Sequence, residues 1–287
     1  MRSANSEADM TCCASCGITQ EVDSEIKLKT CTACKSTKYC SIKCQKDHRP
    51  QHKRFCKKRA AELHDEILFR QPDSTHEGDC PICCLPIPID PQDSTRMFCC
   101  CKLICNGCQF ANQLREQEQN LISTCPFCRQ PRSFPQEESE TDLLKRIEVN
   151  DPIAMRNMGK ERYYQGRIKD AFKYWGKGAA LGEVGSHYEL AVMYWEGEGG
   201  VEKDMKKGLF HMEKAAIGGH LAARYNLGTY NHNEGRMDRA VKHFIIAATL
   251  GCVDSIDLLK ECYKTLRQCF VPIRLPWMLQ RVHRENQ

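Results

Sequence analysis

The distribution of cysteine constrains this chain more than any other feature of its sequence. Eighteen of its 21 cysteines precede residue 129, and only Cys252, Cys262 and Cys269 come later. Most early cysteines form pairs separated by two or three residues, a spacing that presents two sulfur atoms to one metal ion. The 287-residue chain therefore divides into a cysteine-rich half, held together by metal, and a half of helix-forming composition. We expect the three later cysteines to be buried small hydrophobic residues.

No segment of the sequence resembles an export signal or a membrane anchor. The N-terminal MRSANSEADM lacks the apolar core of a secretory signal. No window approaches the roughly 18 apolar residues of a membrane span. We therefore expect an intracellular protein, in the cytoplasm or the nucleus, with no membrane partner. In a reducing compartment the cysteine pairs predict zinc sites rather than disulfides.

The formal net charge of +5 and the basic residues between Lys27 and Arg59 raise the question of nucleic-acid binding. Cysteine thiolates that bind zinc would add more negative charge than the metal adds positive charge, so the loaded chain would be close to neutral. The basic stretch also fits the solvated face of a zinc module. The sequence thus favours protein partners over nucleic acid.

Four pairs of metal-binding residue types lie between residues 13 and 56. Zinc takes four sulfur or nitrogen donors, so eight residues predict two ions. The even spacing favours an interleaved arrangement, in which the first and third pairs bind one ion and the second and fourth bind the other. A stretch this short depends on metal for much of its folding free energy. The predicted ligands are Cys13, Cys16, Cys31, Cys34, Cys40, Cys44, His52 and Cys56.

The stretch LKTCTACKSTKYCSIKCQKDHRPQHKRFC resembles a MYND-type zinc finger, through its YCS and CQ steps and the closing His52 and Cys56. The resemblance covers residues 13–56. It implies a protein-interaction module, whose members often bind short proline-rich peptides. Arg49 departs from the family pattern, because many members carry tryptophan in the stretch before the histidine.

Three further C-x2-C pairs and a run of three adjacent cysteines follow. The pairs supply six donors, so a second two-zinc module needs two more from Cys99, Cys100 and Cys101. Neighbouring side chains on extended backbone point to opposite sides, which favours Cys99 with Cys101. Adjacent ligands would instead require a bend between them, and the residues alone leave both pairings open. The paired ligands are Cys80, Cys83, Cys105, Cys108, Cys125 and Cys128.

This layout resembles an all-cysteine RING-type finger, through its CPIC start, a candidate central helix after Cys108 and its CPFCRQP close. The resemblance covers residues 80–130. It implies Cys99 and Cys100 as the middle ligands, with Cys101 as the alternative to either, because the spacing that follows Cys100 matches cysteine-only relatives. Ligases of this type bind a ubiquitin-conjugating enzyme and hold its thioester in a reactive geometry, without a covalent intermediate.

The same resemblance assigns roles on the surface of the second module. It places Ile82 and Pro126 in a shallow apolar groove for the conjugating enzyme. It places Arg129 where active members carry a cation that orients ubiquitin. The alternative is that Ile82 and Pro126 pack the small core and that Arg129 is solvated. The sequence shows no other enzyme constellation, so whether the chain is an enzyme depends on this surface.

From residue 141 to about residue 270 the chain repeats a helix-forming pattern. GAALGEVGSHYELA, AAIGGHLAARYNLG and AATLGCVDSIDLLK begin at residues 178, 215 and 247. This period indicates stacked helix pairs, each of which buries its apolar face against a neighbour. Thr141 or Asp142 is expected to cap the first helix. The residues in register are Gly182, Gly219 and Gly251, and also Trp175, Met212 and Phe244.

The repeats resemble Sel-one-like repeats, a branch of the tetratricopeptide class, through their alanine pairs and register glycines. The joint arrangement resembles a group of RING and repeat proteins from microalgae. We expect a mainly α fold, in which two small zinc-stabilised modules precede an α-solenoid of helix pairs. The expected parts are a MYND-type finger (13–56), a helical linker (57–79), a RING-type finger (80–130), a linker (131–140), helical repeats (141–270) and a C-terminal tail (271–287).

The sequence therefore predicts a zinc-binding protein–protein interaction protein with four zinc ions, two in each finger. It indicates a RING-type ubiquitin ligase or a ligase subunit. Expected partners are a ubiquitin-conjugating enzyme, a substrate or adaptor on the repeats, and proline-rich peptides on the MYND-type finger. Two alternatives stay open, namely a non-catalytic scaffold or adaptor and a nucleic-acid-associated regulator.

Overall fold

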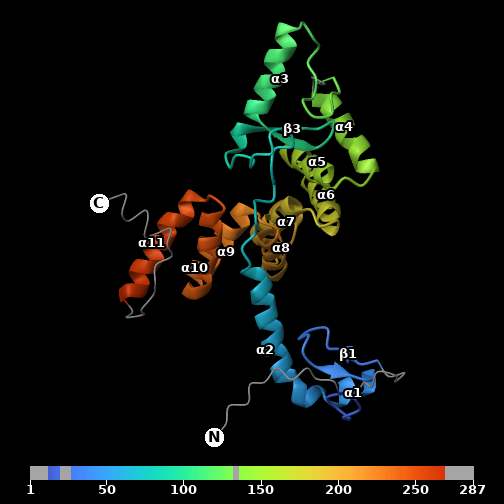
Figure 1. Cartoon of the computed structure of the whole chain (residues 1–287), viewed down its shortest axis with the longest axis vertical. Coiled ribbons are helices and arrows are strands. Elements are labelled where there is room, and N and C mark those ends of the chain that lie inside the picture. The colour runs from blue at the N-terminus through green and yellow to red at the C-terminus, as the bar shows by residue number, and fades with distance from the viewer. Residues whose placement is uncertain (1–11, 20–26, 132–135, 269–287) are drawn as a thin grey trace. The chain divides into compact units, whose positions relative to one another are not determined.

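The computed structural model describes residues 12–19, 27–131 and 136–268 (Figure 1). The predicted tail and Cys269 lie outside the described residues. The chain forms two compact units, residues 1–70 and residues 71–287. The first unit holds the first cysteine-rich module, and the second holds the other module and the helical half. None of the described helices is long and apolar enough to cross a bilayer.

The first unit consists of a short hairpin followed by two helices. β1 (Lys29–Thr30) pairs antiparallel with β2 (Lys38–Tyr39), and α1 (Ile42–Asp47) and α2 (Arg49–Leu68) follow. The side chain of Ser41 caps α1 by accepting a hydrogen bond of 3.2 Å from the backbone N–H of Cys44. Tyr39 is buried, and its neighbours in the core are mostly cysteines. So small an apolar core contributes little to stability by itself.

The second unit begins with the other cysteine-rich module. A 3-10 turn, η1 (Pro91–Asp93), leads into β3 (Ser94–Met97), which pairs antiparallel with β4 (Lys102–Cys105). The helix predicted after Cys108 is α3 (Asn106–Glu118), which begins before Cys108 and includes it. Glu116 on α3 is buried and accepts hydrogen bonds from the backbone N–H and the hydroxyl of Thr124, at 2.9 and 2.6 Å. These bonds attach α3 to the loop that carries the last cysteine pair.

The rest of the second unit is a series of antiparallel helices. From α4 to α11, each helix packs against the next in the chain, and Figure 1 shows this order from green to red. A longer loop containing the 3-10 turn η2 (Glu198–Gly200) joins α7 to α8. The helices are α4 (Gln136–Glu148), α5 (Pro152–Tyr164), α6 (Ile168–Ala180), α7 (Val184–Glu196), α8 (Met205–Ile217), α9 (Leu221–Asn233), α10 (Met237–Thr249) and α11 (Val253–Gln268).

The predicted register of the repeats is confirmed. The three register glycines follow the ends of α6, α8 and α10, and all have positive φ, from 84° to 102°. The three register residues with large side chains, Trp175, Met212 and Phe244, are at most 2% exposed. The glycines therefore form the turns between helix pairs, and the large side chains form the core within each pair. Of the later cysteines, Cys262 is buried and Cys252 is half-buried.

The start of the helical half differs from the prediction. α4 begins at Gln136, so Thr141 and Asp142 lie inside it, and the predicted cap was wrong. Asp142 instead pairs with Lys145 at 3.5 Å, one turn further along the helix. α4 therefore also includes residues 136–140, which the sequence placed in a linker.

An ion-pair network joins the second cysteine-rich module to the first helix pair. Glu77 lies between Arg96 on β3, at 2.6 Å, and Arg156 on α5, at 3.0 Å. Burial opposes ionisation of Glu77, but His76, Arg156 and Arg96 outweigh it and lower the pKa of this carboxyl. Paired charges of this kind hold two segments together, because removing one partner leaves the other buried and uncompensated.

The segment before the module also packs on the turn between α8 and α9. The ring of His76 stacks on that of His220, with centroids 4.2 Å apart, and the backbone N–H of His76 donates to the carbonyl of Gly219. A Cβ atom at Gly219 would lie 2.7 Å from the carbonyl oxygen of Ser74. Glycine is thus required there both by its positive φ and by this close approach. The module and the repeats form one packed body.

Packing in the core of the third helix pair predicts how two glycine substitutions change the stability of the protein. In Gly228→Ala on α9, the new methyl would lie 2.5 Å from the ring of Phe244 on α10. Overpacking of this kind costs about 1–3 kcal/mol. In the control Gly176→Ala on α6, the methyl meets nothing within 4 Å, and replacing a helical glycine with alanine stabilises by up to about 1 kcal/mol. Urea unfolding followed by circular dichroism measures both, and equal stability of the two variants would contradict this packing.

Candidate metal centres

The cysteine and histidine side chains gather into four clusters, in each of which four ligand atoms lie within 4.8 Å of one another. The grouping is the interleaved one, since each cluster joins the first and third or the second and fourth pair of its module. Each cluster can hold one zinc ion. The clusters are Cys13, Cys16, Cys40 and Cys44 (cluster 1), Cys31, Cys34, His52 and Cys56 (cluster 2), Cys80, Cys83, Cys105 and Cys108 (cluster 3), and Cys99, Cys100, Cys125 and Cys128 (cluster 4).

Four of the C-x2-C pairs form the same tight turn. The residue after the second cysteine donates its backbone N–H to the carbonyl of the first, at 2.9–3.0 Å. The same residue has a left-handed φ between 55° and 76°. This turn brings both sulfur atoms to one side of the loop, where they can bind one ion. The left-handed residues are Gly17, Lys35, Cys84 and Arg129, so Cys84 is a turn residue that belongs to no cluster.

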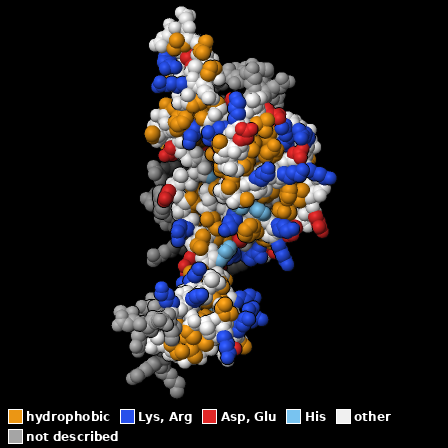
Figure 2. Space-filling model, turned by 90° about the vertical axis from the view of Figure 1, so that its right-hand side faces the viewer, with side chains coloured by type: hydrophobic (Ala, Val, Ile, Leu, Met, Phe, Trp, Pro, Cys, Tyr) orange, Lys and Arg blue, Asp and Glu red, His pale blue; other side chains and the backbone are white. Residues whose placement is uncertain are grey.

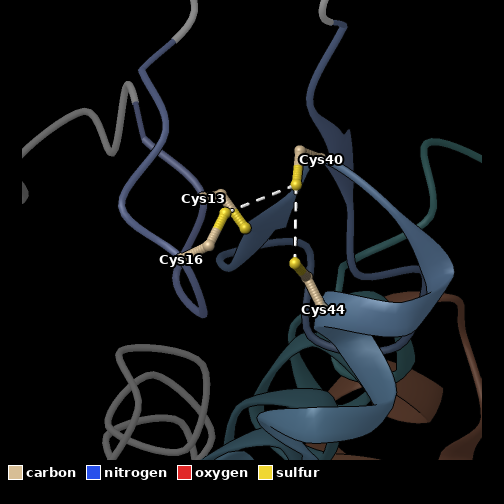
Figure 3. Close-up of side chains that lie close together, drawn as sticks. All are labelled: Cys13, Cys16, Cys40 and Cys44. Atoms are coloured by element: carbon tan, nitrogen blue, oxygen red, sulfur yellow. Dashed lines mark hydrogen bonds between the residues drawn. The ribbon is translucent and has the colours of Figure 1, made fainter.

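Cluster 1 combines one such turn with the start of α1. Figure 3 shows its four side chains turned toward one another. The sulfur of Cys40 lies 3.5 Å from that of Cys16 and 3.5 Å from that of Cys44. Sulfur atoms bound at about 2.3 Å to one tetrahedral zinc ion lie about 3.8 Å apart. The spacing of these sulfur atoms therefore fits zinc.

Cluster 2 contains the one histidine donor. His52 and Cys56 lie one turn apart on α2, and Nε2 of His52 is 3.5 Å from the sulfur of Cys34. Its other ring nitrogen, Nδ1, is 3.4 Å from the hydroxyl of Thr37, a contact that leaves Nε2 free for a metal. Burial, together with nearby His48, lowers the pKa of His52. The ring is thus kept in the neutral form that metal binding requires.

Clusters 3 and 4 lie in the second module, where the structure separates the three adjacent cysteines. Cys99 is 3.4 Å from Cys128 and Cys100 is 3.8 Å from Cys125, measured between sulfur atoms. Cys101 is only 2% exposed and lies in an apolar cluster with Leu143 and Met158 of α4 and α5. Its pKa is raised to about 11, chiefly by burial. It occupies the contact between the module and the repeats.

The backbone explains this separation. β3 ends at Met97 and β4 begins at Lys102, so the three cysteines lie in the hairpin turn rather than in an extended strand. Alternation of side chains, which favoured Cys101 as a ligand, applies only to extended backbone. Cys101 itself has a φ of 54°, a left-handed conformation that directs its side chain away from its neighbours' cluster.

The acid–base chemistry of the thiols also suits a cation. Hydrogen bonds with Cys16 and Cys44 raise the pKa of Cys40 to about 12. Burial opposes ionisation of Cys13, but backbone N–H groups of Cys16, Cys40 and Ser15 outweigh it and lower its pKa to about 6. Four sulfur atoms this close cannot all be thiolates unless a positive charge lies among them. A zinc ion supplies that charge, because it binds the deprotonated form.

The residues expected to contact a ubiquitin-conjugating enzyme lie at the surface of the second module. Ile82 is 42% exposed, outside the core formed by Ile87, Met97 and Ile104. Pro126 is half-buried and Arg129 is exposed. The sequence reading missed two further exposed apolar residues, Phe110 (65%) and Leu114 (45%), on α3. Their spacing of four residues on a polar helix, which puts them on one face, was the available signal.

Comparison with known families supports the assignment of the first module and of the repeats. The family model for the MYND finger matches residues 13–56. The family model for the Sel1 repeat matches residues 152–183, 184–220 and 221–252. Each Sel1 match spans one helix pair, from α5–α6 to α9–α10. The chain therefore contains a MYND finger and three Sel1 repeats. Neither family match includes residues 80–128.

Several solved structures are similar to part of the chain, and two of them illustrate the likeness. One is c5321, a protective antigen of uropathogenic Escherichia coli strains that displays an SLR fold, with 25% identity and a TM-score of 0.40 over 44% of this chain and 29% of that one. The other is a Sel1 repeat protein from Oxalobacter formigenes, with 21% identity and a TM-score of 0.41 over 55% of this chain and 63% of that one. This chain thus covers less than two thirds of either. A search of curated proteins found no match.

The four clusters predict four zinc ions per chain. Removal of zinc by a chelator should unfold both cysteine-rich modules, because their cores are small, and should leave most of the helical half folded. Atomic emission on purified full-length protein measures the zinc content, and circular dichroism with NMR follows the loss of structure. If folded protein contains two zinc ions or fewer, one of the two modules does not bind zinc as predicted.

A second prediction concerns which of the three adjacent cysteines bind zinc, and a matched pair of variants tests it. Cys100→Ser should lose one zinc ion, because serine is a far poorer zinc ligand than thiolate. Cys101→Ser should keep all four, although a hydroxyl buried among Leu143 and Met158 should cost stability of about 1–3 kcal/mol. Zinc content and thermal unfolding distinguish the two. The reverse pattern of zinc loss would make Cys101 the ligand.

Proposed function

We propose that this zinc-binding protein–protein interaction protein is a RING-type ubiquitin ligase or a subunit of one. The observation that supports the proposal is the layout of residues 80–128. Two interleaved four-cysteine clusters flank a β-hairpin, and α3 follows the hairpin. This arrangement resembles a RING-type finger with cysteine at every ligand position. A reducing intracellular compartment, which we propose for this protein, would keep these cysteines reduced and able to bind zinc.

The proposed activity depends on positioning and needs no covalent intermediate. Ile82 and Pro126 would contact the ubiquitin-conjugating enzyme, and burial of exposed Ile82 would contribute apolar binding energy. The guanidinium of Arg129 would donate hydrogen bonds to ubiquitin and restrict the orientations of the thioester. Holding two reacting groups in a productive geometry accelerates reaction between them. Zinc in clusters 3 and 4 would serve structure, because all four ligand positions of each ion are taken by protein.

The Sel1 repeats would present a substrate or an adaptor to this surface. The ion pairs of Glu77 and the burial of Cys101 hold the module against α4 and α5. A partner bound to the repeats would therefore lie at a defined distance from the module. This rigid connection supports substrate presentation better than a flexible tether would, because it limits the positions that the substrate samples.

The ligase surface predicts losses of activity without losses of zinc. In an autoubiquitination assay on the full-length chain with several conjugating enzymes, Ile82→Ala and Arg129→Ala should each lower the rate at least tenfold, equivalent to about 1.4 kcal/mol. Two control variants should match the wild type. Ile67→Ala removes a similarly exposed isoleucine from α2, and Lys145→Ala removes an exposed cation from α4.

Two other outcomes would contradict parts of the proposal. If the wild type is active and both surface variants match it, the ligase surface is misassigned. If the wild type is inactive with every conjugating enzyme while it retains four zinc ions, the chain is a non-catalytic scaffold.

A further inference from the structure

The MYND finger contains a groove beside cluster 2, and three ligands of that cluster, Cys31, His52 and Cys56, form part of its lining. The groove has a volume of about 440 Å³ and lies between the turn at Cys31, helix α1 and helix α2. Three of its lining residues, Ala33, Ile42 and Ala60, are apolar. Ile42 is 68% exposed, a large fraction for an isoleucine in so small a unit. The floor of the groove can therefore receive an apolar side chain from outside.

Every ionised side chain that lines the groove, apart from the metal ligands, is a cation. They are Lys46 on α1 and Arg49, Lys53 and Lys57 on α2. The three on α2 are four residues apart, so they follow one face of the helix. All four are exposed, and Figure 2 shows Lys and Arg side chains at the surface of this part of the chain. The groove thus has an apolar floor and a cationic rim.

Within the described residues, none of these four cationic side chains forms an ion pair, a hydrogen bond or a ring contact. The neighbouring cations of α2 behave differently, since Arg59 pairs with Glu62 and Glu66 at 3.3 and 3.0 Å. Cluster 2 does not neutralise the rim either, because three thiolates and one zinc ion carry a single net negative charge against four positive ones.

We propose that this groove binds an acidic peptide segment of a partner protein, with an apolar side chain of that segment seated on Ala33 and Ile42. The proposal rests on the interaction role of the finger and names the chemistry of its partner. Uncompensated cations raise the local concentration of an acidic chain and speed its association. The apolar floor selects among acidic chains, because burying a side chain there contributes roughly 1.5–3 kcal/mol.

The lining favours a peptide over a nucleic acid. Single-stranded nucleic acids stack their bases on aromatic side chains. The only ring among the lining residues is that of His52, which belongs to cluster 2. Phosphates alone would use the cations but leave the apolar floor exposed. An acidic and apolar peptide satisfies both.

Fluorescence anisotropy on the zinc-loaded full-length chain tests the proposal with four labelled probes. The first is a pool of decapeptides in which Asp or Glu alternates with Leu, Ile, Met or Phe. The second replaces the apolar positions with serine, and the third replaces the acidic positions with glutamine. The fourth is a single-stranded DNA of equal charge. We expect the first pool to bind at least fivefold more tightly than each of the other three.

Variants assign the binding to the groove. Lys53→Gln combined with Lys57→Gln should weaken binding of the first pool at least tenfold, and Ile42→Ser at least fivefold. The control Lys58→Gln removes a cation of the same helix that pairs with Glu62, and should change binding less than twofold. All variants should keep four zinc ions and should match the wild type in autoubiquitination, which relies on the other module.

Four results would overturn the inference. Binding of the DNA that exceeds binding of the first pool and ignores Ile42→Ser would make the groove a nucleic-acid site. Equal binding of the first pool and of the third, which lacks acidic residues, would show that the cations do not contribute to the choice of peptide. If no peptide pool binds, including an added proline-rich pool, the finger does not have the interaction role on which the proposal rests. If the proline-rich pool alone binds, the finger keeps that role but its partner is not an acidic peptide.

Discussion

The close packing of four sulfur or nitrogen donors around each metal position is the constraint on which the cysteine-rich half depends. Among its described residues, the first unit buries Tyr39 in a core of cysteines and has little other buried apolar surface apart from Leu68. Each cluster joins segments some 25 residues apart in the chain, as Cys31 with Cys56 shows. Binding of a structural zinc ion contributes on the order of 10–16 kcal/mol at neutral pH, which exceeds what so few apolar side chains supply. The metal therefore replaces a hydrophobic core.

The second module uses its metal clusters differently, because it also packs on the repeats. Cys101 directly follows two cluster residues in the chain, but it is buried among Leu143 and Met158 instead. Glu77 bridges Arg96 of the module and Arg156 of α5. Zinc would thus shape the module from within, while apolar burial and paired charges fix its position on α4 and α5. A fixed position gives the proposed ligase surface a constant relation to the repeats.

The two cysteine-rich modules present opposite surface chemistries. The groove of the MYND finger has a cationic rim that includes Lys53 and Lys57. The second module exposes apolar side chains, among them Ile82 and Phe110. If the two proposals hold, electrostatic attraction would govern association at the first surface and apolar burial would govern affinity at the second. The two surfaces would then suit different partners.

Much of this architecture follows from local sequence patterns. The spacing of cysteines predicts the four clusters, because a C-x2-C turn depends on few residues, and the repeat period predicts the turns at Gly182, Gly219 and Gly251. The tertiary structure alone decided the environment of Cys101, the bridge between Glu77 and an arginine 79 residues away, and the assembly of one groove from two helices. These features depend on contacts between distant segments, and such contacts leave no periodic signal in the sequence.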